Sequence, residues 1–244
     1  MIKLAMEIPT SHLATWSPLT DFDFALAHKV LEDPAVARFY AERSGSRELI
    51  LDNSMHELGY PLPVKELARA ADLCRADYVI APDQLKQPDQ NLAWFEDTVN
   101  EIAGHHKVAV VHCGPTPGIR QKYFTRVAAR ADMLCLPFRE NRMLWWAEID
   151  RQQLDFPCLR RVHLLGVNDL AELYVFARLS MRDAEWSVDT SKPIKWAIED
   201  RHIGDGFDIR GAKTTSHALL DAKLTTPQVA LMIRNLEHLR AYLV

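Results

Sequence analysis

Polar side chains that follow short apolar runs are the strongest candidates for chemistry in this sequence. They are Asp52, Asp83, His112 and Asp189. If the runs are parallel strands, whose carboxyl ends meet at one edge of a sheet, the three carboxylates converge and raise one another's pKa values. Carboxyl groups in that state are typical general acids, general bases and nucleophiles. The pattern therefore indicates an active site built from carboxylates.

Each aspartate also has a simpler interpretation, because aspartate is a common N-cap residue of helices. At any one position a helix cap is at least as good an explanation as catalysis. Capping does not require three aspartates and a histidine to follow separate strands, however, and we therefore favour a shared site.

The elements that must position these residues are visible as apolar runs without polar alternation, as expected of strands buried on both faces of a parallel sheet. The runs are residues 3–8, 48–51, 78–81, 108–111, 133–136, 162–165 and 186–188. Amphipathic segments between them predict helices, among them Val64–Cys74, Asn91–Ala103 and Asp169–Leu179. Strand starts recur about every 25–30 residues, the length of a βα unit.

These elements fit one TIM-barrel-like α/β domain, (β/α)8, over residues 1–244, since no linker, repeat or low-complexity tract divides the chain. We expect the eighth strand within residues 196–210, or else no eighth strand. The competing architecture is an open doubly wound sheet, which would carry a Gly-rich phosphate turn after its first strand. The residues there are Pro9-Thr10-Ser11-His12, which contain no such turn.

Composition narrows the class of protein. A formal net charge of -4 argues against coating of nucleic acid through bulk charge, although it leaves a local basic patch open. The four cysteines are far apart, which favours reduced thiols in the cytoplasm over a disulfide framework. Glu7 and Pro9 come too early for a signal peptide, and no apolar run approaches the roughly 20 residues of a membrane span. We therefore expect a cytoplasmic protein with no membrane partner.

The sequence resembles the tRNA-guanine transglycosylase superfamily at four places, which occur in the family's order between residues 48 and 193. Asp52-Asn53-Ser54 is similar to the family's aspartate-serine-glycine-glycine motif, and Asp83, after residues 78–82, is similar to its base-recognition aspartate. His163-Leu164-Leu165-Gly166-Val167 resembles its leucine-methionine-glycine-valine strand. A helix and a strand that ends in the nucleophilic aspartate follow in the family, as residues 169–179 and Asp189 do here.

The sequence departs from the family's pattern in three ways. Ser54-Met55 replaces the glycine pair, and His112-Cys113-Gly114 takes the place of a glutamine-glycine-glycine turn. No cysteine follows Cys158, so the C-terminal zinc site of the tRNA enzymes is absent. Among family members the chain most resembles the short phage-type enzymes that insert 7-deazaguanine bases into DNA, which implies neither a metal nor a cofactor.

The resemblance implies base exchange, in which a 7-deazaguanine such as preQ0 replaces guanine in a polynucleotide through a covalent aspartyl-glycosyl intermediate. Asp189 would be the nucleophile, and Asp52 would move a proton to or from the base. Asp83 would bind the base, together with Ser54, His112, Gly114, Leu165 and Gly166. The polynucleotide, DNA in preference to tRNA, would contact Lys192, Lys195 and Lys213.

Two other classes of protein also fit the sequence. A metal-dependent TIM-barrel hydrolase or aldolase would use Asp52, Asp83, His112 and Asp189 as ligands, although no H-x-H or H-E-x-x-H pair is present to begin such a site. A non-catalytic relative would bind nucleic acid through the barrel, with the aspartates as helix caps.

Two further groups of residues have simpler explanations than a functional one. His202, Asp205 and Asp208 could suggest a metal, but their glycine-rich setting favours a loop. The densest basic clusters, Arg139 with Arg142 and Arg160 with Arg161, could contact phosphates, but solvated helix ends are the commoner role.

Overall fold

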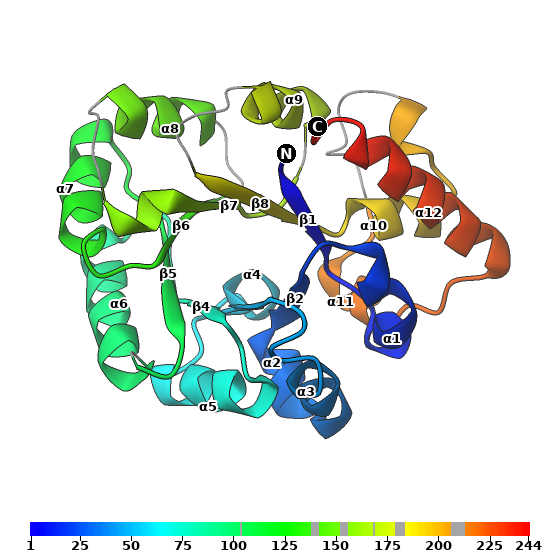
Figure 1. The fold of residues 1–244 in the computed structure, drawn as a ribbon, viewed down its shortest axis with the longest axis horizontal. Coiled ribbons are helices and arrows are strands. Elements are labelled where there is room, and N and C mark those ends of the chain that lie inside the picture. Colours follow the sequence, from blue (N-terminus) through cyan, green and yellow to red (C-terminus); the bar gives the residue numbers. More distant parts are fainter. Residues whose placement is uncertain (103, 138–141, 152–155, 168, 179–183, 206–212) are drawn as a thin grey trace.

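The computed structural model describes residues 1–102, 104–137, 142–151, 156–167, 169–178, 184–205 and 213–244. Eight parallel strands form a nearly closed barrel with helices around it, which confirms the predicted TIM-barrel-like α/β fold (Figure 1). The strands are β1 (Lys3–Met6), β2 (Asp23–Leu26), β3 (Leu49–Asp52), β4 (Tyr78–Ile80), β5 (Lys107–Val111), β6 (Met133–Leu136), β7 (Arg161–Leu164) and β8 (Glu185–Thr190).

The helices surround the ring of strands, and α4 projects over its interior in Figure 1. They are α1 (Leu13–Trp16), α2 (Ala27–Glu32), α3 (Pro34–Ala41), α4 (Met55–Leu58), α5 (Val64–Cys74), α6 (Pro88–Ile102), α7 (Pro117–Val127), α8 (Arg142–Arg151), α9 (Leu170–Arg178), α10 (Lys192–Ile198), α11 (Ser216–Leu220) and α12 (Thr226–Arg240). None of them, in the part of the chain that the structure describes, is long and apolar enough to cross a membrane.

Helix α5 shows how the spacing of apolar residues in the sequence determines which face of a helix packs on the barrel. Its buried residues Leu67, Ala70, Ala71 and Cys74 recur at helical spacing on one face, as predicted for Val64–Cys74. The other two predicted helices correspond to α6 and α9, and their expected last residues, Ala103 and Leu179, lie outside the described residues.

The eighth strand is β2, so its expected position within residues 196–210 was wrong. The described part of that segment holds the end of α10 and a 3₁₀ turn, and residues 206–210 lie outside the described residues. Strand β2 was not predicted because the charged residue Asp23 interrupts its apolar run. Asp23 is nevertheless buried, since Arg43 and Arg47 bond its two carboxylate oxygens at 3.2 and 2.8 Å.

The strands pair in the order β1-β8-β7-β6-β5-β4-β3-β2, which leaves β1 and β2 as the two edges that must meet. Asp21 joins them. Its backbone N–H donates to the Leu4 carbonyl, and its carboxylate accepts from the Leu4 N–H, both at 2.8 Å. A side chain thus replaces part of the missing strand ladder.

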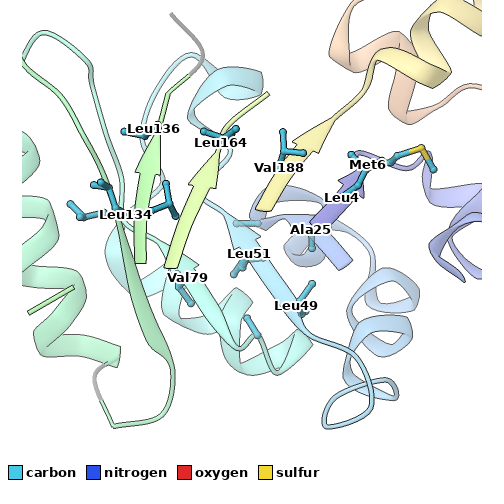
Figure 2. Packing of buried hydrophobic residues seen from close by; sticks show 14 of the residues in the cluster. Leu4, Met6, Ala25, Leu49, Leu51, Val79, Leu134, Leu136, Leu164 and Val188 are labelled. Atoms are coloured by element: carbon cyan, nitrogen blue, oxygen red, sulfur yellow. The ribbon is translucent and has the colours of Figure 1, made fainter. Parts of the chain in front are cut away.

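Alternation along the strands divides the core into two layers. Outward side chains such as Leu4, Leu51, Leu134 and Val188 pack beneath the helices (Figure 2). Inward side chains fill the barrel; they include Ala5, Phe24, Ile50, Tyr78, Ile80, Ala109, Val111, Met133 and Cys135. The same period of two directs Glu7, Asp52 and Asp189 inward at the carboxyl end of the barrel, here called the mouth.

At the opposite end of the barrel, where the strands begin, Arg161 packs against side chains of neighbouring strands. Its guanidinium lies 4.8 Å from the ring centroid of Tyr78 and bonds Glu48 and Glu185. Arg161 is therefore a structural ion-pair residue, and the expectation of a phosphate contact or a solvated helix end at this position was wrong.

Candidate active site

Asp189 lies on the inward face of β8 and is 3% exposed. Its Oδ1 accepts a hydrogen bond from the Gly166 N–H at 2.9 Å and lies 3.1 Å from His163 Nε2. A carboxylate oxygen only accepts, so His163 Nε2 is the donor of this bond, and its Nδ1 lies 2.9 Å from the Ser187 hydroxyl. Two donors from the β7 region thus hold the carboxylate in one orientation.

The turn that presents the Gly166 N–H is built by Arg142. Gly166 has a φ of 67°, in the left-handed region that glycine adopts without strain. The Arg142 Nη1 donates to the carbonyls of Leu165 and Gly166 at 3.0 and 3.1 Å, and its Nη2 bonds Glu172 at 2.5 Å. Arg142 is 1% exposed, so the expectation of a phosphate contact or a solvated helix end was wrong; Arg139 lies outside the described residues.

Acidic side chains gather at the mouth around Asp189. The carboxyl cluster consists of Glu7, Asp52, Glu57, Asp83 and Asp189, which follow or lie on β1, β3, α4, β4 and β8. Each member interacts electrostatically with at least one other member. The sequence-based expectation that the three aspartates converge agrees with this arrangement.

Glu7 is a member of the cluster whose pKa is raised. Burial raises its pKa from the ordinary 4.5 to about 8; Asp189 and Glu57 add to the rise, and Lys195 and Lys192 oppose it. Its Oε2 is buried and has no hydrogen-bond partner among the described residues. Glu7 therefore holds a proton at neutral pH.

The raised pKa of Glu7 predicts a pH-dependent stability. The unfolded chain loses the Glu7 proton near pH 4.5, whereas the folded chain keeps it until about pH 8. Between these values the unfolded state binds fewer protons, so the free energy of unfolding falls as pH rises. Glu7→Gln has no such proton to lose, so its stability relative to the wild type should rise across this window, by up to about 1.4 kcal/mol per pH unit.

Urea unfolding of both proteins at several pH values between about 5 and 8 measures the difference. The exposed Glu101→Gln serves as the control and should track the wild type. A constant stability difference between Glu7→Gln and the wild type over the whole window would contradict the prediction.

Asp52 and Glu57 are also shifted toward the protonated form. Burial raises the pKa of Asp52 well above its usual range, with help from Glu57, Asp189 and Asp83, and against a hydrogen bond from the Ser54 N–H at 2.7 Å. Burial likewise raises the pKa of Glu57, which His56 partly opposes. Protonated carboxyl groups beside Asp189 are suited to donate protons.

A tight turn after β3 links Asp52 to Asp83. Ser54 has a φ of 62°, and its buried hydroxyl accepts from the His28 N–H at 3.1 Å. Asn53 donates to Asp83 Oδ1 at 3.1 Å and to the Ala81 carbonyl at 2.8 Å. The turn sets the spacing between the candidate proton-transfer group and the candidate base-recognition group.

The helix-cap alternative fits Asp52 better than it fits the other two aspartates. Asp52 accepts the Ser54 N–H just before α4. Asp83 does not cap α6, because that helix begins only at Pro88. At the start of α10 the Lys192 N–H donates to the Thr190 hydroxyl and not to Asp189. The described hydrogen bonds of Asp189 go to β7 and its following turn, and none goes to α10.

Some predicted site residues lie away from the cluster. His112 packs its ring against Phe124 and Trp145, with centroids 5.6 and 5.5 Å away, between β5 and helices α7 and α8. Burial and the nearby Arg120 lower the pKa of His112 to about 3, so the ring is neutral. Lys213 is exposed, and its N–H donates to Glu199 at 2.6 Å beside the end of α10.

Gly114 has a packing reason for its identity. Its φ is 136°, and a Cβ built there would lie 2.8 Å from Arg120 Cγ. Its N–H donates to the Leu85 carbonyl at 3.1 Å, and its carbonyl accepts from Arg120 at 3.2 Å. The backbone N–H and carbonyl of Gly114 are thus both hydrogen-bonded to other residues of the protein. Leu165, another predicted site residue, is partly buried and packs against the inner layer of the barrel.

The structure therefore brings together most of the predicted residues at one place. Those at the mouth are Asp52, Ser54, Asp83, Leu165, Gly166 and Asp189, with Lys192 and Lys195 close enough to lower the pKa of Glu7. His163, Glu7 and Glu57 were missed. Glu7 and His163 fall inside predicted strands, and only their inward position in the alternation could have singled them out.

The described residues contain no group of three or more His, Cys, Asp or Glu side chains arranged to hold a metal ion. His202 instead accepts the Gly204 N–H at 3.0 Å and lies against His238, with ring centroids 5.4 Å apart. Asp208 and the side chain of Asp205 lie outside the described residues.

Comparison with known proteins adds no identification. No protein-family model matches the chain, and no curated protein matches it. What the protein does must therefore be inferred from the barrel and the carboxyl cluster.

Proposed function

We propose that this protein is a base-exchange transglycosylase that replaces guanine in a polynucleotide, DNA in preference to tRNA, with a 7-deazaguanine such as preQ0. The observation that carries the proposal is the position of Asp189, held by two donors at the mouth beside carboxyl groups whose pKa values are raised. A fixed nucleophile next to a protonated acid is what the exchange of a glycosidic bond requires.

In the first step the glycosidic bond breaks and a sugar ester forms. Both described donors point at Oδ1 of Asp189, which leaves Oδ2 to attack C1′ of the target nucleotide. The electron pair of the C1′–N bond goes to the departing guanine, and the carboxyl group of Asp52 supplies the proton that the base takes up.

The second step reverses the first with a different base. Asp52, now a carboxylate, accepts the ring N–H proton of the incoming deazaguanine, whose nitrogen attacks C1′ and releases Asp189. Lys192 and Lys195 lie near the carboxyl cluster and offset the negative charge that passes between its members. The site thus ends the cycle in its starting protonation state.

The direct test is an exchange assay with labelled guanine and labelled deazaguanine. Each base is incubated with the protein and single-stranded DNA, duplex DNA or tRNA, and the label in the recovered polymer is measured. The proposal predicts protein-dependent labelling of DNA above tRNA. Absence of label from all three polymers would refute it.

Base recognition provides a second, independent prediction. Asp83 facing the Watson–Crick edge of a guanine-like base accepts from its ring N–H and its exocyclic amine, whereas an adenine-like base presents a ring acceptor there. Leaving a buried polar group unpaired costs about 1–3 kcal/mol, and more for a charged group. Asp83→Ala should therefore weaken guanine-type binding by about tenfold or more and reduce discrimination against adenine-type bases.

Paired binding titrations with guanine-type and adenine-type bases measure both effects. Asp97→Ala, an exposed change on α6, is the matched control and should behave as the wild type. An unchanged preference in Asp83→Ala would show that another group recognises the base.

A further inference from the structure

A surface groove lies between α6 and α7 and has a volume of about 790 Å³. It begins where β4 and β5 end, since Lys86 follows Asp83 and Pro115 follows Gly114 in the chain. The groove therefore opens at the same end of the barrel as the carboxyl cluster. Its volume is within the range of pockets that bind small ligands, roughly 300–1,000 Å³.

The lining of the groove carries more positive than negative charge. Lys86, Lys122 and Arg126 are exposed there, and Asp89 is the only acidic residue among those that line it. None of the three cations has an ion pair with a described residue. Gln121 and Thr125 add uncharged hydrogen-bonding groups to the same wall.

The arrangement of the cations on α7 is unfavourable without a ligand. Lys122 and Arg126 are four residues apart, so they lie on one face of the helix and repel each other. Along the helix axis they are about 6 Å apart, a distance comparable with the repeat of phosphates along a single strand. A bound polyanion would relieve this repulsion.

Tyr123 connects the groove with the carboxyl cluster. It lines the groove, is 5% exposed, and is hydrogen-bonded to Cys113 at the end of β5. Asp83 is near enough that its charge helps to raise the pKa of Tyr123. The wall of the groove that contains Tyr123 therefore lies near the residue proposed to recognise the base.

We propose that the α6–α7 groove binds the phosphate backbone of a single-stranded polynucleotide and leads the target nucleotide to the mouth. The binding site is independent of the chemistry at Asp189, but its role as a path to the mouth rests on the proposed transglycosylase function. A protein with a net charge of -4 needs such a local basic surface to bind a polyanion. Lys86, Lys122 and Arg126 are the proposed phosphate contacts.

The test compares two triple variants of the full chain. Lys86→Ala/Lys122→Ala/Arg126→Ala removes the groove cations, and Arg38→Ala/Lys223→Ala/Arg234→Ala removes three exposed cations on or next to α3 and α12. Binding of fluorescein-labelled oligothymidylate and oligouridylate is followed by anisotropy over a series of salt concentrations. All substituted side chains are exposed, so thermal unfolding should show unchanged folding for both variants.

We expect the groove variant to lose affinity about tenfold or more at low salt. The slope of log K against log salt should also become shallower by roughly 2, because each single-strand phosphate contact contributes about 0.7. The control variant should keep the wild-type slope. Equal binding to DNA and RNA would show that phosphate alone is recognised, and a preference for one would show an added contact to sugar or base; either agrees with the groove.

Three outcomes would overturn the proposal. They are wild-type affinity in the groove variant, an equal loss in the control variant, and competition by polyglutamate as strong as by oligonucleotide, which would indicate an acidic protein partner. Base-exchange assays separate this proposal from the transglycosylase function. Groove-dependent binding without exchange refutes only the function, whereas exchange by the groove variant with an unchanged KM for the polynucleotide refutes only the groove.

Discussion

Asp189→Asn should reduce the kcat of base exchange by a factor on the order of 10³ or more while the protein stays folded. An amide cannot form the glycosyl ester, so the chemical step is lost. The remaining amide oxygen can still accept from the Gly166 N–H and His163 Nε2, the bonds that Oδ1 makes in the wild type. The variant should therefore keep the wild-type affinity for the base and the wild-type melting temperature.

Trapping the intermediate makes this test sharper. With DNA and no acceptor base, the wild type should form a covalent protein–DNA species that survives denaturing electrophoresis, and Asp189→Asn should form none. Asp221→Asn, an exposed change, is the control and should trap normally. Wild-type turnover or trapping in Asp189→Asn would assign the nucleophile to a different residue.

The largest expected loss of stability follows from Arg142→Ala. This side chain is fully buried, pairs with Glu172 through both Nε and Nη2, and donates to the carbonyls of Leu165 and Gly166. Its removal leaves a half-buried carboxylate and two half-buried carbonyls without their donor. Breaking a buried ion pair from one side costs about 3–5 kcal/mol, and we expect a decrease of that size in the free energy of unfolding.

Urea unfolding measures the change, with the exposed Arg160→Ala as a control that should stay within about 0.5 kcal/mol of the wild type. If Arg142→Ala does not fold, Glu172→Gln provides a milder removal of the same pair. The double change Arg142→Met/Glu172→Leu should cost less than Arg142→Ala, because it leaves no charge unpaired. Equal stability of Arg142→Ala and Arg160→Ala would show that the pair contributes nothing.

Much of the barrel could be predicted from the sequence, because strands buried on both faces appear as apolar runs in a single short window. Helix α5 was predictable for a related reason, since Leu67, Ala70, Ala71 and Cys74 repeat at helical spacing. Strand β2 could not be found in this way. Asp23 looks like a surface residue until Arg43 and Arg47, on a different segment, are brought against it.

The residues of the candidate site also fall into two groups, those that the sequence predicted and those that only the fold brings there. The sequence by itself determined that Asp52, Asp83 and Asp189 lie at or just past the carboxyl ends of buried strands, and parallel strands carry these ends to one place. Only the tertiary structure decided which neighbouring side chains join them. Glu7 and His163 face inward with Asp189, whereas His112 lies between β5 and the outer helices.

The physical reason is that strand and helix periodicity is a local property of the chain, whereas burial of charge is not. Arg142 and Glu172 are far apart in the sequence and look solvated there, yet Arg142 is buried against Glu172 and holds the turn that binds Asp189. Likewise, the pKa of Glu7 is raised because residues from other segments bury its carboxyl group and place the negative charges of Asp189 and Glu57 near it. These effects come into being only when the barrel closes.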